Sequence, residues 1–209
     1  MGVRLAAKRT PVRACARPPV RIFTLPQRLI TNSLAEKLNL SIYLKTAIIL
    51  HMFKKITRQN HDRLIKQKKT ISVAESCTGG ILSSQLTSLA GSSDYFLLGA
   101  VTYSNKSKEI VLGIPTRTIA KYGAVSQPVA ILMAQNIRKK THADLGLSIT
   151  GIAGPTGATP SKSIGTVYIC LATKNKNTCR KFHFTGSRQD IRKKSTQGAL
   201  RLLCAHLSQ

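Results

Sequence analysis

The sequence lacks metal-binding cysteine motifs and any apolar run long enough to cross a membrane. Its five cysteines form no CxxC pair and have no histidine cluster near them, so we expect reduced thiols and no bound metal. The most apolar stretch, residues 39–53, is 15 residues long and contains Lys45, whereas a membrane-spanning helix needs ~20 apolar residues. We therefore expect no membrane partner.

Acidic residues are also scarce, since 33 Lys and Arg stand against 7 Asp and Glu and the formal net charge is +26. Such an excess is typical of proteins that bind nucleic acid, because Lys and Arg neutralise phosphates. Here it is spread along the chain, with 16 basic and 2 acidic residues in 1–70 and 17 and 5 in 71–209. No zinc finger, helix-turn-helix or RNP-like aromatic motif organises it. We expect the charge to solubilise the chain or attract a small anionic substrate, and nucleic acid not to be the main partner.

The N-terminal part differs from the rest. Residues 1–30 hold seven basic residues, four prolines and no acid, so residues 1–53 are predicted to be a disordered extension and residues 54–209 a single domain. The extension resembles an organelle transit peptide, although its prolines interrupt an amphipathic helix and residues 1–30 hold no serine. The alternative is an over-extended start, with Met52 nearer the true beginning. We expect a cytoplasmic protein, or an organelle-targeted one if the extension is a targeting peptide.

From about residue 54 the hydrophobic pattern alternates between strand and helix periodicity. This alternation predicts an α/β fold with three layers, α/β/α, around a mixed, mainly parallel sheet whose last two strands form a hairpin. The expected strands cover residues 70–76, 95–104, 144–154, 165–173 and 179–186, and the expected helices cover residues 54–67, 77–91, 106–112, 126–141 and 187–207.

Three polar segments follow expected strand ends, where open α/β sheets bind ligands. In the first, AESCTGG, Ser76 stands where a strand turns into a helix, so that N–H groups of residues 77–80 can face an anion or a developing oxyanion. Thr78, Gly79 and Gly80 are candidate substrate-binding residues, and the two glycines leave room for close approach. The alternative is that Ser76 only caps the helix. Cys77 is a rival nucleophile, because a helix N-terminus lowers a thiol pKa, but it has no paired histidine.

A serine nucleophile needs a base. None of the five histidines follows a strand beside a glycine turn, so a Ser-His-Asp triad is not expected. The second segment, TYSNKSK, supplies Tyr103, Lys106 and Lys108 after the next strand. A lysine whose pKa is lowered by burial can act as the base, with Tyr103 relaying a proton or orienting the amine. The alternative is that both lysines are solvated surface charges.

The third segment, TGIAGPTGATP, is rich in glycine. Thr150, Gly151, Gly154 and Gly157 are candidates for an anion-binding nest of backbone N–H groups, although the GK[ST] of a Walker A loop is absent. A plain flexible connection is the alternative. Arg188, at the start of the last helix, either clamps a phosphate or is exposed to solvent.

Seven blocks of this chain resemble one family in order and spacing over about residues 54–207. They are AESCTGG, GSSDYF, VTYSN followed by Lys108, GAVS, TGIAGP, GTVY and F-x-G-x-R. The family is the C-terminal domain family of the competence/damage-inducible protein CinA. The resemblance implies a nicotinamide-nucleotide amidohydrolase, which converts nicotinamide mononucleotide to nicotinic acid mononucleotide and ammonia in pyridine-nucleotide salvage, without metal or cofactor. It implies Ser76 as the nucleophile and Lys108 as the base, and Tyr103 matches the tyrosine of the motif.

Two positions depart from the family pattern. Lys106 stands where the family commonly has an acid, and Ser163 stands where a proline precedes the GTVY block, which leaves substrate preference and loop geometry open. Residues 1–53 are too few and too basic for the larger N-terminal domain of full-length relatives, so we expect a stand-alone enzyme, monomeric or homo-oligomeric. The alternatives are a non-catalytic nucleotide-binding or regulatory module, and nucleic-acid binding through the basic extension.

Overall fold

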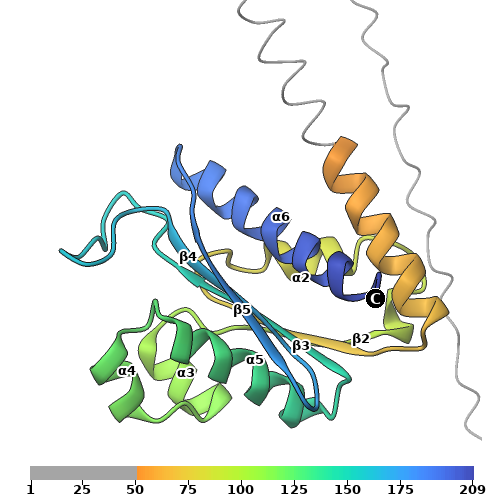
Figure 1. Cartoon of the computed structure of the whole chain (residues 1–209), viewed down its shortest axis with the longest axis horizontal. Helices are drawn as coiled ribbons and strands as arrows, with labels where there is room; N and C mark the ends of the chain where they lie inside the picture. Colours follow the sequence, from red (N-terminus) through yellow and green to blue (C-terminus); the bar gives the residue numbers. More distant parts are fainter. Residues whose placement is uncertain (1–50) are drawn as a thin grey trace, which may run out of the picture. The chain divides into compact units, whose positions relative to one another are not determined.

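The computed structural model describes residues 51–209. Of the extension predicted over residues 1–53, residues 1–50 lie outside this range. A helix covers residues 51–66, which includes the start of the basic helix expected from residue 54. The elements that follow (Figure 1) are β1 (Ile71–Glu75), α2 (Ile81–Leu86), a 3-10 turn (Ser92–Asp94), β2 (Phe96–Val101), α3 (Asn105–Leu112), α4 (Thr116–Tyr122), α5 (Gln127–Thr141), β3 (Leu145–Gly151), β4 (Thr166–Ala172), β5 (Asn177–His183) and α6 (Arg188–His206).

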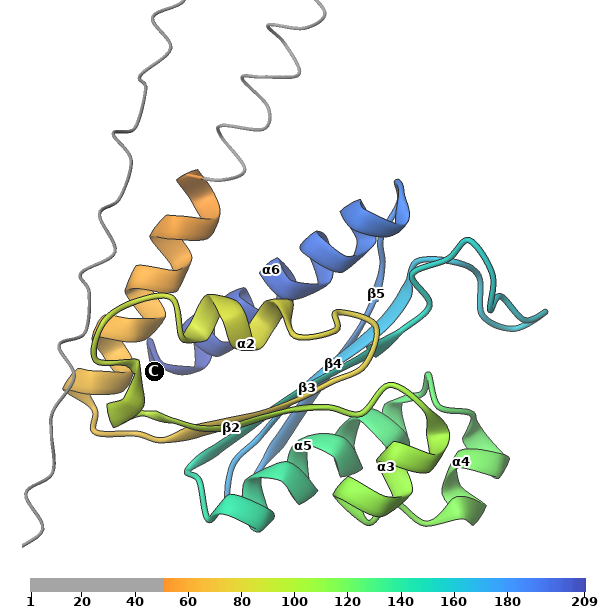
Figure 2. The same ribbon diagram turned by 180° about the vertical axis from the view of Figure 1, so that it is seen from behind.

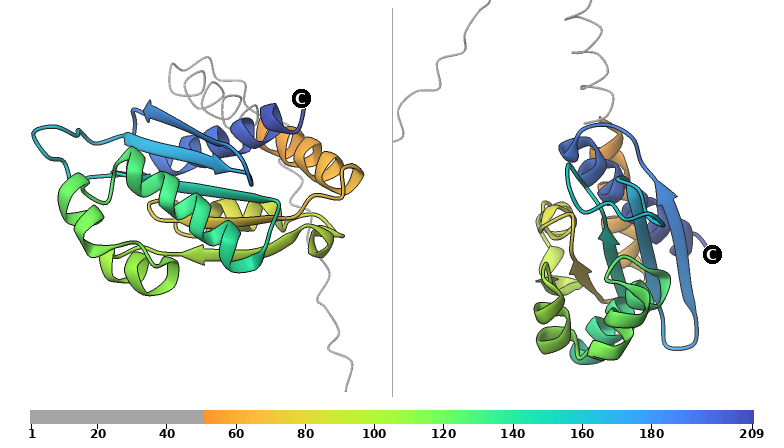
Figure 3. Two further views of the ribbon diagram at one scale, coloured as in Figure 1. Left: turned by 60° about the horizontal axis from the view of Figure 1, so that its bottom comes forward. Right: turned by 90° about the vertical axis from the view of Figure 1, so that its left-hand side faces the viewer.

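The five strands form one sheet in the order β2-β1-β3-β4-β5. β1 is parallel to both of its neighbours, β2 and β3, whereas β4 is antiparallel to β3 and to β5. Every strand except β4 therefore points the same way. Figure 3 shows the β4–β5 hairpin as the blue edge of the sheet. The predicted mixed, mainly parallel sheet is confirmed.

Helices cover both faces of the sheet. The helix 51–66, α2 and α6 pack on one face, where Leu64, Leu82 and Leu203 belong to the larger core cluster. Helices α3, α4 and α5 pack on the other, around Met133 and Ile137. Figure 2 shows these two groups on opposite sides of the strands. The predicted α/β/α layers are confirmed, and the central strands β1 and β3 are buried along almost their whole length because helices cover both of their faces.

The helix expected over residues 77–91 is wrong in extent, because α2 covers only Ile81–Leu86. Gly79 and Gly80 have φ angles of 59° and 95°, a left-handed conformation that a right-handed helix does not contain. They separate β1 from α2 by a turn. The N-cap of α2 is Gly80, so Ser76 does not cap this helix, which removes the alternative role considered for it.

Two further details differ around α4 and α5. The short helix α4 was not expected; its sequence signals are Pro115 before it and Gly123 after it. Ser126 is the N-cap residue of α5 as predicted, but its hydroxyl donates to the carbonyl oxygen of Gly123 at 2.8 Å and accepts from no helix N–H.

Glu75, the last residue of β1, supplies the cap that Gly80 lacks. Its carboxylate is fully buried and accepts hydrogen bonds from the N–H groups of Gly80, Leu82 and Ser83 at 3.0, 3.1 and 2.8 Å, and from the Ser83 hydroxyl at 2.7 Å. The first N–H groups of a helix have no partner within the helix, and negative charge at this end is favourable. The carboxylate therefore ties the start of α2 to β1 and closes the turn that carries Ser76.

No helix within residues 51–209 is both long and apolar enough to span a membrane. In the same part of the chain, no three side chains of His, Cys, Asp or Glu gather closely enough to hold a metal ion.

Replacing Glu75 tests its role at the junction. Glu75→Ala leaves buried donors without an acceptor, and we expect it to lower the free energy of unfolding by about 3 kcal/mol. Glu75→Gln keeps one acceptor oxygen and is expected to cost about half as much. Urea unfolding followed by circular dichroism measures both. The control is Asp62→Asn. Asp62 is exposed, and its Oδ1 lies 3.9 Å from Arg58 Nη1, an ion pair that contributes less than about 1 kcal/mol to stability. Equal losses in Glu75→Ala and Asp62→Asn would contradict this role.

Candidate active site

The three polar segments meet beyond the carboxyl ends of β1, β2 and β3, around a cavity of about 280 Å³. Of the residues considered for the site from the sequence, Thr78, Gly79, Gly80 and Lys106 lie outside this lining. The predicted residues that line it are Ser76, Tyr103, Lys108, Thr150, Gly151, Gly154, Gly157 and Arg188.

Backbone hydrogen bonds fix the corner that carries Ser76 on both sides. The Ser76 N–H donates to the carbonyl oxygen of Ile149 in β3 at 3.0 Å. On the other side, the Thr102 N–H donates to the carbonyl oxygen of Glu75 at 2.8 Å, which continues the β1–β2 pairing by one residue. The position of the Ser76 hydroxyl is therefore set by the sheet.

Thr78, Gly79 and Gly80 belong to the turn between β1 and α2, and none of them lines the cavity. The Gly79 N–H donates to the carbonyl oxygen of Ser76 at 3.1 Å, and the Gly80 N–H is held by Glu75. The carbonyl oxygen of Thr78 accepts from Arg192 of α6 at 2.8 Å, a contact that sequence reasoning missed. Of the four N–H groups expected to face a ligand, only those of Cys77 and Thr78 have no acceptor among residues 51–209.

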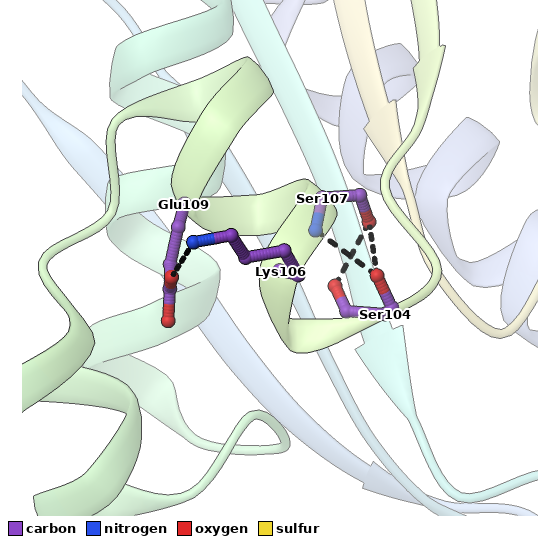
Figure 4. A network of polar contacts seen from close by, with 4 residues as sticks. All are labelled: Ser104, Lys106, Ser107 and Glu109. Atoms are coloured by element: carbon purple, nitrogen blue, oxygen red, sulfur yellow. Dashed lines mark hydrogen bonds and ion pairs between the residues drawn. The ribbon is translucent and has the colours of Figure 1, made fainter.

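Ser104 and Ser107 cap the start of α3, the helix that carries both candidate lysines (Figure 4). The Ser104 hydroxyl accepts from the Ser107 N–H at 3.0 Å, and the Ser107 hydroxyl donates to the Ser104 carbonyl oxygen at 2.9 Å. The Lys106 side chain points to solvent, and its Nζ lies 3.6 Å from Glu109 Oε2. Lys108 turns inward and is 1% exposed. The surface-charge alternative is therefore right for Lys106 and wrong for Lys108.

The Lys108 amine has three hydrogen-bond partners. Nζ lies 3.2 Å from Ser76 Oγ, 2.8 Å from the carbonyl oxygen of Thr102 and 3.2 Å from the carbonyl oxygen of Tyr103. Carbonyl oxygens only accept, so they take two N–H groups of the amine. In the neutral amine the remaining position on nitrogen is the lone pair, which is then directed at the serine hydroxyl. This arrangement suits proton transfer from Ser76 to Lys108.

Burial lowers the pKa of Lys108 to about 8, while the nearby Cys77 acts in the opposite direction. A buried ammonium loses its hydration, which favours the uncharged form. With a pKa of about 8, roughly a tenth of the lysine is neutral at pH 7. The site thus holds a base in the range where a general base works.

Cys77 lines the same cavity, but burial raises the pKa of its thiol to about 12. Since the thiolate is the reactive form of cysteine, this thiol is a poor nucleophile near neutral pH. The geometry favours Ser76 over Cys77.

Tyr103 and Arg188 stand together at the cavity. The Tyr103 side chain is 57% exposed, and its hydroxyl accepts from Arg188 Nη2 at 2.7 Å. Arg188 Nη1 donates to the carbonyl oxygen of Gly154 at 2.6 Å. The tyrosine hydroxyl has no hydrogen bond to Ser76 or Lys108 within the described chain, so the orienting contact with the amine comes from its main-chain carbonyl.

The glycine-rich segment and the GAVS block complete the wall. A Cβ at Gly151 would lie 2.6 Å from Val167 Cγ2, so glycine is needed there for the close approach of β4. The Thr150 hydroxyl donates to the carbonyl oxygen of Ala124 at 2.9 Å, and Ala124 and Val125 line the cavity beside it. The sequence analysis quoted these two residues only within the GAVS block and did not propose them for the site, since apolar residues in a loop carry no chemical signal.

Comparisons with known proteins agree with this architecture. The CinA C-terminal domain family matches residues 53–207. A CinA-like protein of Syntrophus aciditrophicus is 47% identical over 146 residues, which is 69% of this chain and 35% of that protein. A CinA-like protein of Desulfotalea psychrophila is 49% identical over 146 residues, covering 70% of this chain and 35% of that protein. The chain thus spans about a third of the length of these relatives.

Solved structures show the same fold. The competence/damage inducible protein CihA from Agrobacterium tumefaciens has a TM-score of 0.73 at 32% identity, over 76% of this chain and 96% of that one. A competence-damaged protein (CinA) superfamily protein from Klebsiella pneumoniae has a TM-score of 0.72 at 28% identity, over 75% and 98%. Sequence and fold agree, and the chain belongs to the CinA C-terminal domain family.

Proposed function

We propose that this domain is an amidohydrolase in which Ser76 attacks a carboxamide and neutral Lys108 takes the serine proton. The observation that carries the proposal is the 3.2 Å contact between Ser76 Oγ and an amine whose two other partners are carbonyl oxygens. Serine is a weak nucleophile until a neighbouring base activates it, and this amine is a suitable base by position and by its lowered pKa.

The reaction proceeds by two acyl transfers. Ser76 Oγ bonds to the carboxamide carbon while its proton moves to Lys108 Nζ, and the tetrahedral oxyanion accepts from the N–H group of Cys77, a residue that lines the cavity. The lysine proton then passes to the leaving nitrogen, and ammonia departs from an acyl-serine ester. Neutral Lys108 next deprotonates a water, which attacks the ester, and the released serine oxygen recovers the proton. The products are a carboxylic acid and ammonia.

The substrate we propose is nicotinamide mononucleotide, which becomes nicotinic acid mononucleotide within pyridine-nucleotide salvage. The family resemblance supports this choice, and so does the cavity. Its volume of about 280 Å³ is near the lower end of the range of ~300–1,000 Å³ that small-molecule sites occupy. Arg188 lines the cavity and is exposed to solvent, where a guanidinium can bind the phosphate.

Removal of either member of the pair is expected to abolish the reaction. Ser76→Ala and Lys108→Met should each lower kcat at least about 1,000-fold, because nucleophile and base act as one unit. Ammonia release from nicotinamide mononucleotide, coupled to glutamate dehydrogenase, measures the rate, and circular dichroism checks the fold. Lys106→Met is the matched control and should retain activity. Undiminished turnover by Ser76→Ala would refute the assignment, and tight binding by the unaltered protein without turnover would favour a non-catalytic module.

The pH dependence follows from the state of Lys108. Its neutral form is the active one, and the amine is protonated below its pKa of about 8. We therefore expect kcat/KM to rise about tenfold per pH unit below pH 8 and to level off above it. Initial rates at low substrate concentration between about pH 6 and 9.5 measure this profile. A profile that is flat through pH 8 would argue against lysine as the base.

Arg188 is expected to act in binding. Arg188→Gln should raise KM for the mononucleotide about tenfold or more with kcat little changed, because a charge-assisted contact to phosphate contributes ~1.5–3 kcal/mol. The comparison substrate is nicotinamide riboside, which has no phosphate and should show no such difference between the two proteins. Lys193→Gln, an exposed change five residues along α6, is the control. An equal KM increase with both substrates would contradict phosphate recognition by Arg188.

A further inference from the structure

A second hollow, of about 630 Å³, lies between β5 and α6, and none of its lining residues belongs to the Ser76 cavity. It shares Arg180, Leu202 and Ala205 with an adjoining hollow of about 220 Å³ that reaches Lys176. At its other side it shares Gln197 and Arg201 with a hollow of about 160 Å³ beside the helix 51–66. The three hollows form one elongated depression, which we name the β5–α6 groove.

The fold places selected side chains of both elements in this groove. β5 is the edge strand of the sheet; Arg180 and Phe182 alternate along it and share one face, and Phe184 follows directly after its end and lines the same hollow. Lys194 and Arg201 are seven residues, about two turns, apart on α6 and also share a face. Figure 1 shows α6 running over the β4–β5 side of the sheet. The groove is therefore built by two segments that only the fold brings together.

The groove is cationic, and Asp190, which interacts electrostatically with Lys194, does not line it. Its three hollows are lined by basic residues and by no Asp or Glu. The ion pairs found in residues 51–209 involve Arg58 and Lys106, which lie elsewhere. At one end, burial together with the positive charges of Lys69 and Lys176 lowers the pKa of His206. Such a surface attracts a polyanion and repels a second copy of this basic chain.

Two aromatic side chains line this groove and pack against the larger core cluster beneath it. The rings of Phe182 and Phe184 are stacked, with centroids 5.3 Å apart and planes 10° from parallel, and both side chains are half-buried. Grooves that combine cations with flat aromatic side chains are typical of single-strand binding, because phosphates contact the cations and bases contact the rings. An acidic peptide would use the cations but not the rings. A membrane would need a protruding apolar surface in place of a concave one.

We infer that the β5–α6 groove binds single-stranded nucleic acid, with Lys176, Arg180, Lys194 and Arg201 on its phosphates and the Phe182–Phe184 pair against its bases. The sequence offered no nucleic-acid motif because these residues come from separate segments. This binding is independent of the reaction proposed for Ser76.

The test uses the full chain and a fluorescein-labelled oligothymidylate of about 16 nucleotides, a length at the upper end of known single-strand sites. Fluorescence anisotropy is measured at several salt concentrations. The double variant Arg180→Ala/Arg201→Ala should raise Kd about tenfold and reduce the salt slope by about 1.4, since each lost phosphate contact removes ~0.7 from the slope. The matched control is Lys139→Ala/Lys140→Ala, which removes the same charge from exposed positions at the end of α5 and should change Kd less than about twofold.

A second variant tests the rings separately from the charges. Phe184→Leu keeps an apolar side chain and should weaken binding roughly tenfold with no change in salt slope, because base stacking is lost while the phosphate contacts stay. Photo-crosslinking with a 5-iodouracil oligonucleotide, mapped by mass spectrometry, should mark peptides that contain Phe182–Phe184 or Lys194–Arg201.

Four outcomes would overturn the inference. They are no binding of the oligonucleotide, equal losses in the groove and control double variants, crosslinks confined to residues 1–50, and competition by polyglutamate as effective as by unlabelled oligonucleotide. The last would assign the groove to an acidic peptide. Ammonia release by the groove variants should stay unchanged, so a failure here is separable from a failure of the proposed reaction.

Discussion

The site depends on a lysine amine that is buried without an anionic partner. Lys108 loses its hydration on the inner side of α3, and in exchange it gains two carbonyl oxygens and one hydroxyl. Both carbonyls belong to the residues just after β2, and Thr102 is itself paired to β1 through the carbonyl oxygen of Glu75. The distance between base and nucleophile is therefore fixed by the pairing of β1 with β2, which Thr102 continues by one residue, and by the carbonyl oxygens of Thr102 and Tyr103. Such preorganisation keeps the reacting groups in place without further ordering of side chains.

A buried carboxylate lies close by, yet it does not neutralise the lysine. Glu75 immediately precedes Ser76, and its oxygens accept from the start of α2, so it forms no ion pair with Lys108. An opposite charge beside an amine favours the protonated form, whereas burial alone favours the neutral form. Because the carboxylate binds backbone N–H groups, the amine experiences mainly burial. The Glu75 carboxylate thus stabilises the turn, and the Lys108 amine remains available as a base.

Much of this arrangement could be predicted from the sequence, because strand periodicity and the rule that parallel strands end at one edge bring Ser76 and Lys108 together. The turn before α2 was not predicted, since Ile81, Leu82 and Leu86 keep helical spacing whether the helix begins at 77 or at 81. The periodicity of apolar residues does not reveal that Gly79 and Gly80 adopt a left-handed backbone conformation. The partners of Glu75, and the binding of the Tyr103 hydroxyl by Arg188 from 85 residues away, are set by tertiary contacts that no local pattern contains.

The net charge alone did not predict the function, because the basic residues lie in different environments of the folded domain. The basic residues look evenly spread along the sequence, but the fold sorts them by environment. Lys108 is buried and easily deprotonated, Arg188 and Arg192 donate to backbone carbonyls around the site, and Arg180 and Arg201 face a groove that holds no acid. The energy of a charge depends on the dielectric and the partners around it. Basic residues can therefore act, within one small domain, as a general base when neutral, as hydrogen-bond donors that hold a turn in place, and as a surface that attracts anions.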